Sequence, residues 1–191
     1  MRKRFNEFVE CVSCGASSPD ISRALALCSA CIRAGGELVE RHIEDAHARV
    51  RSAFGLPALP PRSPGGRNCR ICGNACSLAE GERGYCGLRV VEDGKLLHLA
   101  GTARNGIAEY YYDPLPTNCV ADWVCPGSGD RGRNNLAVFL GACSFDCLFC
   151  QNAQYRMLTA CLGPVCTPAQ LAEAAGDHVG CICYFGGAPP P

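Results

Sequence analysis

The chain has 191 residues, a length that accommodates one or two domains. Lysine plus arginine and aspartate plus glutamate each number 18, so the formal net charge is zero. A non-specific nucleic-acid binder needs a basic surface, so that class is not indicated. The basic residues Arg2–Arg4 are followed by no apolar run, and no stretch approaches the roughly 20 apolar residues of a membrane span. We therefore expect neither a secretory signal nor a membrane segment.

The chain contains seventeen cysteines, an unusually high number for its length. Secreted disulfide scaffolds and intracellular metal proteins are the two classes this rich in cysteine. The count is odd, and many of the cysteines come in C-x2-C pairs, which suit metal ions. We therefore expect a cytoplasmic, oxygen-sensitive iron–sulfur protein.

Residues 1–55 contain two C-x2-C pairs separated by thirteen residues, a spacing that predicts a structural zinc site. The four predicted ligands are Cys11, Cys14, Cys28 and Cys31. A small domain of this size usually needs a metal in order to fold, so a structural role suffices. The alternative is a finger that binds a partner or nucleic acid, which we disfavour because the segment is not notably basic.

An amphipathic helix is predicted over about 37–54. Val39, Ile43 and Ala46 recur at helical spacing, with charged residues on the other faces. The segment therefore resembles a small zinc ribbon or treble clef packed on one helix. His42 and His47 fall on the polar side of that helix, where we expect them to be solvated and not to bind metal.

Residues 56–66 contain four prolines and two glycines, a composition that predicts a linker between domains. Four cysteines then follow within eighteen residues and are expected to complete a closed metal site. They are Cys69, Cys72, Cys76 and Cys86. The metal is either a structural zinc or an auxiliary iron–sulfur cluster that relays electrons to a second site.

The region after Cys86 predicts β-structure. Asp93-Gly94 between two apolar runs, 88–92 and 95–100, indicates a two-residue hairpin. A further strand is expected over 107–112, and 127–135 is expected to be a loop. Cys119 and Cys125 either belong to the Cys69 site or are buried thiols, and their spacing does not decide between the two.

The apolar run 136–140 predicts a buried strand that leads directly into a C-x3-C-x2-C loop. Iron–sulfur clusters are held by closely spaced thiolates of this kind. Cys143, Cys147 and Cys150 would supply three ligands to a four-iron cluster and leave one iron open to a small molecule. The alternative interpretation is zinc or disulfides, although no fourth cysteine or histidine lies close by in the sequence.

After this loop, Thr167 as N-cap and Pro168 predict a helix to about residue 175, followed by a strand over 181–185. Together with the strand 136–140 they would form a right-handed βαβ unit. The remaining cysteines show no ligand spacing and are expected to be buried thiols: Cys161, Cys166, Cys181 and Cys183.

At the cysteine loop the chain resembles the radical SAM enzymes, whose signature is C-x3-C-x2-C after the first barrel strand with an aromatic residue, here Phe149, before the last cysteine. The continuation Cys150-Gln151-Asn152 is similar to that of the activating enzymes of glycyl-radical enzymes. The resemblance implies that the open iron of a 4Fe-4S cluster binds S-adenosylmethionine, which is cleaved reductively to a 5′-deoxyadenosyl radical. It also implies that Phe149 lines the adenine side, and that Gly186 and Gly187 line the methionine side.

The resemblance covers roughly residues 67–191, since a similar C-x2-C-x3-C and G-x-C-G segment precedes the cluster loop in relatives of pyruvate formate-lyase activating enzyme. Ala188 departs from the family pattern, which has an acidic residue after the two glycines. The implied partners are an electron donor such as flavodoxin or ferredoxin and a glycyl-radical enzyme as protein substrate. Because a radical SAM barrel normally has six βα units, we expect this chain to be a truncated form.

These observations predict an α/β fold made of four regions. They are a zinc-ribbon-like domain with one helix (1–55), a linker (56–66), a cysteine-rich metal-binding and hairpin region (67–135) and the first part of a radical SAM partial (β/α) barrel (136–191). The rival hypothesis is non-enzymatic, namely an iron–sulfur electron carrier or a zinc-stabilised interaction module.

Overall fold

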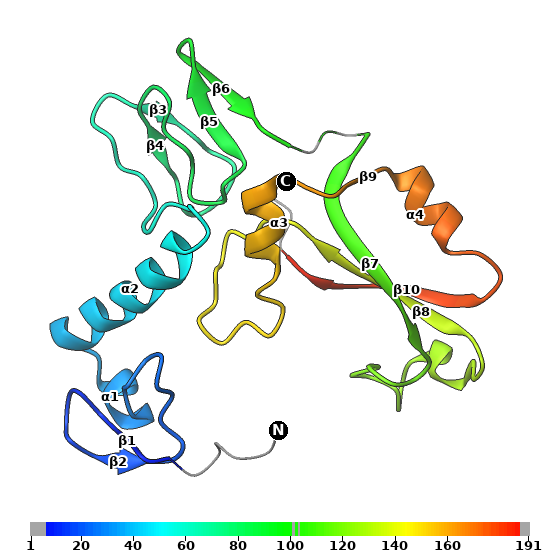
Figure 1. Cartoon of the computed structure of the whole chain (residues 1–191), viewed down its shortest axis with the longest axis horizontal. Coiled ribbons are helices and arrows are strands. Elements are labelled where there is room, and N and C mark those ends of the chain that lie inside the picture. Colours follow the sequence, from blue (N-terminus) through cyan, green and yellow to red (C-terminus); the bar gives the residue numbers. More distant parts are fainter. Residues whose placement is uncertain (1–6, 101, 103, 188–191) are drawn as a thin grey trace. The chain divides into compact units, whose positions relative to one another are not determined.

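A computed structural model of the chain describes residues 7–100, 102 and 104–187 (Figure 1). Ala188, at which the family pattern is broken, lies outside these residues. The chain divides into two compact units, Met1–Ala53 and Phe54–Pro191. Each unit has its own apolar core and is described by itself.

The first unit is a short hairpin followed by two helices. Strands β1 (Val9–Glu10) and β2 (Ser17–Ser18) pair antiparallel, and helices α1 (Ser29–Ala34) and α2 (Glu37–Ser52) follow. The helix predicted over 37–54 is therefore present as α2. The short helix α1 was not predicted. The unit's buried core consists of Cys11, Ile21, Leu27 and Val39.

The second unit contains the remaining elements, several of which are only two residues long. These are strands β3 (Arg67–Asn68), β4 (Ser77–Leu78), β5 (Arg89–Glu92), β6 (Lys95–His98), β7 (Gly106–Pro114), β8 (Asn134–Leu140), β9 (Val165–Cys166) and β10 (Val179–Gly186), the 3-10 helix η1 (Pro126–Gly129), and helices α3 (Tyr155–Cys161) and α4 (Pro168–Ala174).

Residues 56–66 are packed into the second unit and do not form the separate linker that we expected. The Ser63 N–H donates to the Ser77 carbonyl at 2.9 Å, and the Ser77 N–H donates to the Pro61 carbonyl at 2.9 Å. The Arg62 guanidinium also donates to the Asn74 carbonyl at 2.6 Å. Proline lacks an N–H but keeps its carbonyl, so a proline-rich segment can still accept hydrogen bonds along the edge of a strand.

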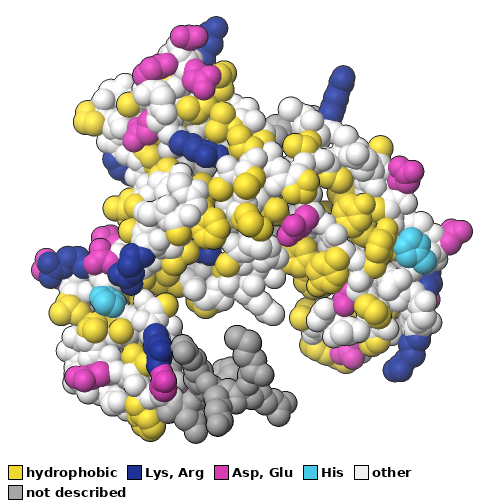
Figure 2. All heavy atoms as spheres, viewed as in Figure 1, with side chains coloured by type: hydrophobic (Ala, Val, Ile, Leu, Met, Phe, Trp, Pro, Cys, Tyr) yellow, Lys and Arg dark blue, Asp and Glu magenta, His cyan; other side chains and the backbone are white. Residues whose placement is uncertain are grey.

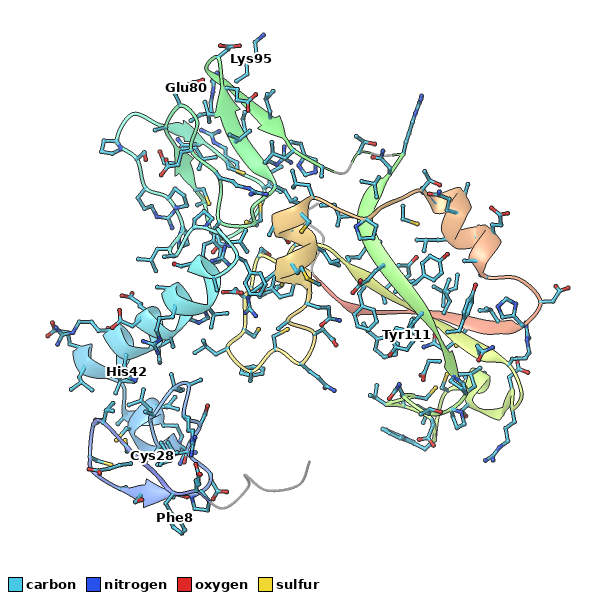
Figure 3. All side chains as sticks on the ribbon, viewed as in Figure 1. Phe8, Cys28, His42, Glu80, Lys95 and Tyr111 are labelled. Atoms are coloured by element: carbon cyan, nitrogen blue, oxygen red, sulfur yellow. The ribbon has the colours of Figure 1, made fainter. Side chains whose placement is uncertain are left out.

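The hairpin predicted at Asp93-Gly94 is present as β5 and β6. Both turn residues have positive φ, 51° and 67°, as a two-residue turn of this kind requires. The Glu80 carboxylate accepts hydrogen bonds from the N–H groups of Asp93 at 2.6 Å and of Gly94 at 3.0 Å, and Figure 3 shows Glu80 near the tip of this hairpin. The hairpin turn is therefore fixed by an acidic side chain from the preceding loop.

The main sheet has the strand order β10-β8-β7-β9. Strands β8 and β10 are parallel, as the βαβ prediction requires. Strand β7 pairs antiparallel with the whole length of β8, from Ala108 opposite Leu140 to Pro114 opposite Asn134. The boundary expected between residues 135 and 136 was wrong, because the strand that precedes it shares a sheet with the strands that follow it. The described residues form an open mixed sheet and no barrel.

The two faces of this sheet are covered differently. Helix α4 packs on one face, against the buried residues Ala108, Leu136, Val138 and Val179. It begins after Thr167, the predicted N-cap, and a capping box between Thr167 and Gln170, which was not predicted, fixes this start. The other face carries a row of stacked aromatic rings with Phe139 between Tyr111 and Phe185, at centroid distances of 5.7 and 6.0 Å. Figure 3 places Tyr111 on this sheet, and Figure 2 shows hydrophobic side chains gathered over it.

A first prediction concerns Gly141, which follows β8. A Cβ at this position would lie 2.3 Å from Ile107 Cγ2 and 3.3 Å from Leu158 Cβ. We expect Gly141→Ala to lower the free energy of unfolding by about 1–3 kcal/mol through overpacking. The matched control is Gly106→Ala, where nothing lies within 4 Å of the added methyl group. Urea denaturation of both variants measures the difference, and equal unfolding midpoints would contradict the prediction.

Candidate metal centres

The four cysteines of the first unit come together in one cluster. Their Sγ atoms all lie within 4.8 Å of one another, and the members are Cys11, Cys14, Cys28 and Cys31. Among the residues that the structure describes, this is the one cluster of three or more cysteine, histidine or acidic side chains whose ligand atoms approach this closely. Figure 3 labels Cys28 in this cluster and His42 on α2, which is half-buried and lies outside it.

Local structure explains why these thiols meet. Cys11 and Cys14 lie in the turn between β1 and β2, while Cys28 is the N-cap of α1 and Cys31 lies in its first turn. The Cys28 N–H donates to Cys11 Sγ at 3.3 Å, and the Cys31 N–H donates to Cys28 Sγ at 3.4 Å. The hairpin turn and the start of α1 thus each contribute two sulfur atoms to the cluster.

The backbone prepares two of these thiols to be anionic. The N–H of Cys28 lowers the pKa of the Cys11 thiol to about 6, and the N–H of Cys31 lowers the pKa of Cys28. At Cys14 the N–H of Ala16 acts in the same direction, but hydrogen bonds with the other three thiols raise its pKa to about 12. The thiolate form is therefore favoured at Cys11 and Cys28 and disfavoured at Cys14. A bound cation would stabilise the thiolate form of all four cysteines. The cluster could hold a metal ion.

The second set, in the region 67–87, is less tightly gathered. Cys69 and Cys76 are buried with Leu78 and Tyr85, and the Cys69 N–H donates to the Cys76 carbonyl at 2.8 Å. Burial raises the pKa of Cys86, and the nearby thiols of Cys72, Cys69 and Cys76 raise it further. The four thiols are thus neighbours, but they do not all approach within 4.8 Å, so their shared site stays a prediction.

The third set lies on the loop that follows β8. Cys143 and Cys150 are half-buried, and Cys147 is exposed. Phe149 is also exposed, with 91% of its surface accessible. The loop is sharply turned, because Ala142 and Asp146 both have positive φ, 76° and 52°. The ligation of a common cluster by the three thiols of this loop stays a prediction.

Asp146, between the first two cysteines of this loop, is fully buried and holds the loop in place. Its carboxylate accepts hydrogen bonds from Arg156 Nε at 2.8 Å and from the Tyr155 hydroxyl, and it pairs with Arg156 Nη2 at 2.6 Å. Burial, followed by the bond to Asp146, raises the pKa of Tyr155. Sequence analysis missed all three residues. The one signal in the sequence for this ion pair was an acidic residue inside the cysteine motif with an arginine ten residues after it.

Two hydrogen bonds join the second and third sets. Asn74, in the turn between Cys72 and Cys76, donates to the Ser144 carbonyl at 2.8 Å. The Tyr85 hydroxyl, next to Cys86, donates to Asp146 at 3.4 Å. The region that carries Cys69–Cys86 is therefore hydrogen-bonded directly to the loop that carries Cys143–Cys150, although the two are far apart in the sequence.

Gly186 and Gly187 lie against both ends of the third loop. A Cβ on Gly187 would lie 2.3 Å from the Leu140 carbonyl oxygen, and the φ of this residue is 76°. A Cβ on Gly186 would lie 3.0 Å from Asn152 Cβ. The Asn152 side-chain amide donates to the Phe185 carbonyl at 2.8 Å. The two glycines therefore leave β10 at the sheet edge where the cysteine loop leaves β8, and no larger residue fits at Gly187.

Cys119 and Cys125 have neighbours that the sequence did not indicate. Burial raises the pKa of Cys119, and the thiols of Cys181 and Cys125 and the carboxylate of Asp113 raise it further. Burial likewise raises the pKa of Cys181, followed by the Cys183 thiol. These four cysteines are half-buried, as is Cys166, whereas Cys161 is exposed on α3 and is not the buried thiol that we expected.

A second prediction concerns the first unit. Because its thiols form a closed four-sulfur set, residues 1–53 should bind about one zinc ion per chain, and a chelator should unfold α2 reversibly. Metal analysis and the helical circular dichroism signal measure both effects. In the matched control Cys161→Ser, the metal content of the full chain should be unchanged, whereas Cys28→Ser should lose one ion. A folded, metal-free unit would contradict the prediction.

A third prediction concerns the Asp146–Arg156 ion pair. Asp146→Asn leaves the buried guanidinium of Arg156 without its counter-ion, so we expect a loss of about 3–5 kcal/mol in the free energy of unfolding. The control is Asp130→Asn, which breaks a half-exposed pair with Arg133 at 2.8 Å and should cost less than about 1 kcal/mol. Denaturant unfolding compares the two, and equal losses would show that Asp146 does not anchor the loop.

Comparison with known proteins adds no family to these observations. No family model, no curated protein and no solved structure matches the chain. Within the described ranges, no helix combines the length and the apolar character needed to cross a membrane. Any function must therefore be argued from the sites themselves.

Proposed function

We propose that this chain is an iron–sulfur protein of the radical SAM type, with Cys143, Cys147 and Cys150 as the ligands of a 4Fe-4S cluster. The observation that carries the proposal is the meeting of two segments at one sheet edge. The cysteine loop follows β8, Gly186-Gly187 ends the parallel strand β10, and the two are in contact. Ligand sites in parallel α/β sheets lie at the carboxyl ends of neighbouring strands.

The donor set of this loop suits a cluster with one open iron. Cys147 is exposed and Cys143 and Cys150 are half-buried, whereas the single carboxylate within the loop, Asp146, is buried and bound to Arg156. The loop therefore offers three sulfur ligands and no carboxylate as a fourth. A site that keeps an open position can bind a small molecule at the metal, as catalytic zinc sites do with three protein ligands.

The chemistry would come from the cofactors, since a reduced cluster with S-adenosylmethionine supplies a 5′-deoxyadenosyl radical for hydrogen abstraction. The chain's own residues would hold and orient them. Backbone groups at Gly186 and Gly187 would face the methionine part, because glycine allows close approach. Phe149 is exposed beside the last cysteine, where it could cover the adenine. Asp146 would fix the loop so that the thiols need not reorganise on binding.

The second set is proposed to support the third. Asn74 and Tyr85 reach from the Cys69–Cys86 region to Ser144 and Asp146, so a metal bound there would stiffen the loop that holds the cluster. A zinc ion would act only mechanically. An auxiliary cluster would also shorten the electron path from a donor such as flavodoxin or ferredoxin. A glycyl-radical enzyme is the proposed protein substrate, on the resemblance of the residues that follow Cys150.

The first unit favours a second, non-enzymatic role for its own part of the chain. Its closely gathered thiols could hold one metal ion in a module built from a hairpin and two helices. We propose that this ion is a structural zinc and that the module serves folding or partner binding.

A fourth prediction tests the proposed radical chemistry. In anaerobically reconstituted full chain, S-adenosylmethionine should shift the EPR signal of the reduced cluster and yield 5′-deoxyadenosine. Cys147→Ala should abolish both effects, because only two cluster thiols remain. The matched control Cys161→Ala removes an exposed thiol outside the loop and should retain both.

The opposite outcome of this experiment is equally specific. A cluster that has four protein ligands and shows no spectral response to S-adenosylmethionine would reject the radical proposal. The electron-carrier function would then replace it.

A further inference from the structure

The face of the main sheet that carries the stacked aromatic rings also carries a row of polar side chains across three strands. Asp113 on β7 is the partner of Asn135 on β8, and Asn135 is the partner of Cys181 on β10. The Cys181 thiol donates to Asn135 Oδ1 at 3.6 Å, which shows that these two side chains share a face. Cys183 lies two residues further along β10 and therefore points to the same side.

The loop between β7 and β8 brings two more cysteines to this row. Cys125 Sγ lies 3.7 Å, and Cys181 Cβ lies 4.0 Å, from the point where a Cβ on Gly127 would be. Cys119 has the Cys181 and Cys125 thiols and the Asp113 carboxylate as its electrostatic neighbours. Four thiols from two separate segments thus surround one region of the sheet face.

The loop that supplies Cys125 is fastened by its own hydrogen bonds. The Cys125 N–H donates to the Ala121 carbonyl at 2.9 Å. The Ser128 hydroxyl lies within hydrogen-bond distance of two carbonyl oxygens, 2.6 Å from that of Asp122 and 2.8 Å from that of Cys125, and shares its proton between them. Cys125 also begins the 3-10 helix η1. These hydrogen bonds therefore define the turn that carries the Cys125 thiol.

The groups around this region are donors that suit a cation. Asp113 is buried, with an exposed fraction of 6%, and its carboxylate lies near the Cys119 thiol. Arg133, the nearby cation, is already paired with Asp130 at 2.8 Å. A divalent cation bound here would be stabilised by the charge of this carboxylate and of the ionised thiols. Thiolates in such numbers select zinc or iron over magnesium or calcium.

We propose that Cys119, Cys125, Cys181 and Cys183 form a further metal site for a zinc-type divalent cation, with the Asp113 carboxylate beside it. The sulfur atoms are more widely spaced than in the first unit, so binding requires rotation of the thiols about χ1. The site does not depend on the radical proposal. Cys181 lies five residues before Gly186 on β10, which places it about 16 Å along the strand from the edge where the cysteine loop emerges.

The fifth prediction measures zinc on the full chain. The protein is reduced and loaded anaerobically with excess zinc alone, free metal is removed, and bound zinc per chain is determined. The double variant Cys125→Ser/Cys181→Ser should bind about one zinc fewer than the wild type. The matched control Cys161→Ser/Cys166→Ser should bind as much as the wild type. A folded test variant with unchanged zinc content would overturn the proposal.

A second measurement on the wild type decides the matter even if the test variant does not fold. Iodoacetamide labelling followed by mass spectrometry compares the zinc-loaded chain with the chelator-treated chain. The proposed site requires Cys119 and Cys125 to be protected by zinc and to react after its removal, while Cys161 reacts equally in both. Equal labelling of Cys119 and Cys125 with and without zinc, or a disulfide between Cys125 and Cys181 in the loaded protein, would reject the site.

Discussion

The second unit depends on one buried ion pair. Asp146 is fully buried within the cysteine loop, and its carboxylate is held by Arg156 from the helix that follows. Burying a charge is costly unless it is paired, so the loop can turn this residue inward only because α3 supplies the guanidinium. The pair links the end of β8 to α3, and Tyr85 extends the link to the cysteine-rich region. Loop, helix and cysteine-rich region therefore form one network.

The sequence predicted local features of the fold better than their assembly. The turn at Asp93-Gly94, helices α2 and α4, and the parallel pair β8 and β10 were all predicted, because each depends on short-range signals such as capping, periodicity and turn chemistry. The antiparallel pairing of β7 with β8 was not, since no local pattern encodes which strands become neighbours. Residues 56–66 were predicted to be a linker for the same reason, since no local pattern shows that the Pro61 carbonyl accepts a hydrogen bond from Ser77 on β4.

The cysteine sets differ in how far their spacing determined their geometry. C-x2-C pairs meet in the first unit because a hairpin turn and a helix start each bring two thiols together over a few residues. Cys119 and Cys125 lie in the loop between β7 and β8. They come near Cys181, more than fifty residues away in the sequence, because β8 and β10 are neighbours in the sheet. Asp146 and Arg156 were not predicted to interact, because their pairing depends on both side chains being buried. The neighbouring sequence gives no sign of that burial.

Strand β8 has a neighbour on each side, β7 antiparallel and β10 parallel. Both rows of its backbone hydrogen-bonding groups are therefore occupied along most of its length. Any additional strand, whether from the same polypeptide or from another, has to join the sheet at β10, at β9 or at the part of β7 that β9 leaves free, and can never join at β8. The cysteine loop would thus always follow an interior strand, however many strands joined the sheet, because no other strand can displace the neighbours of β8.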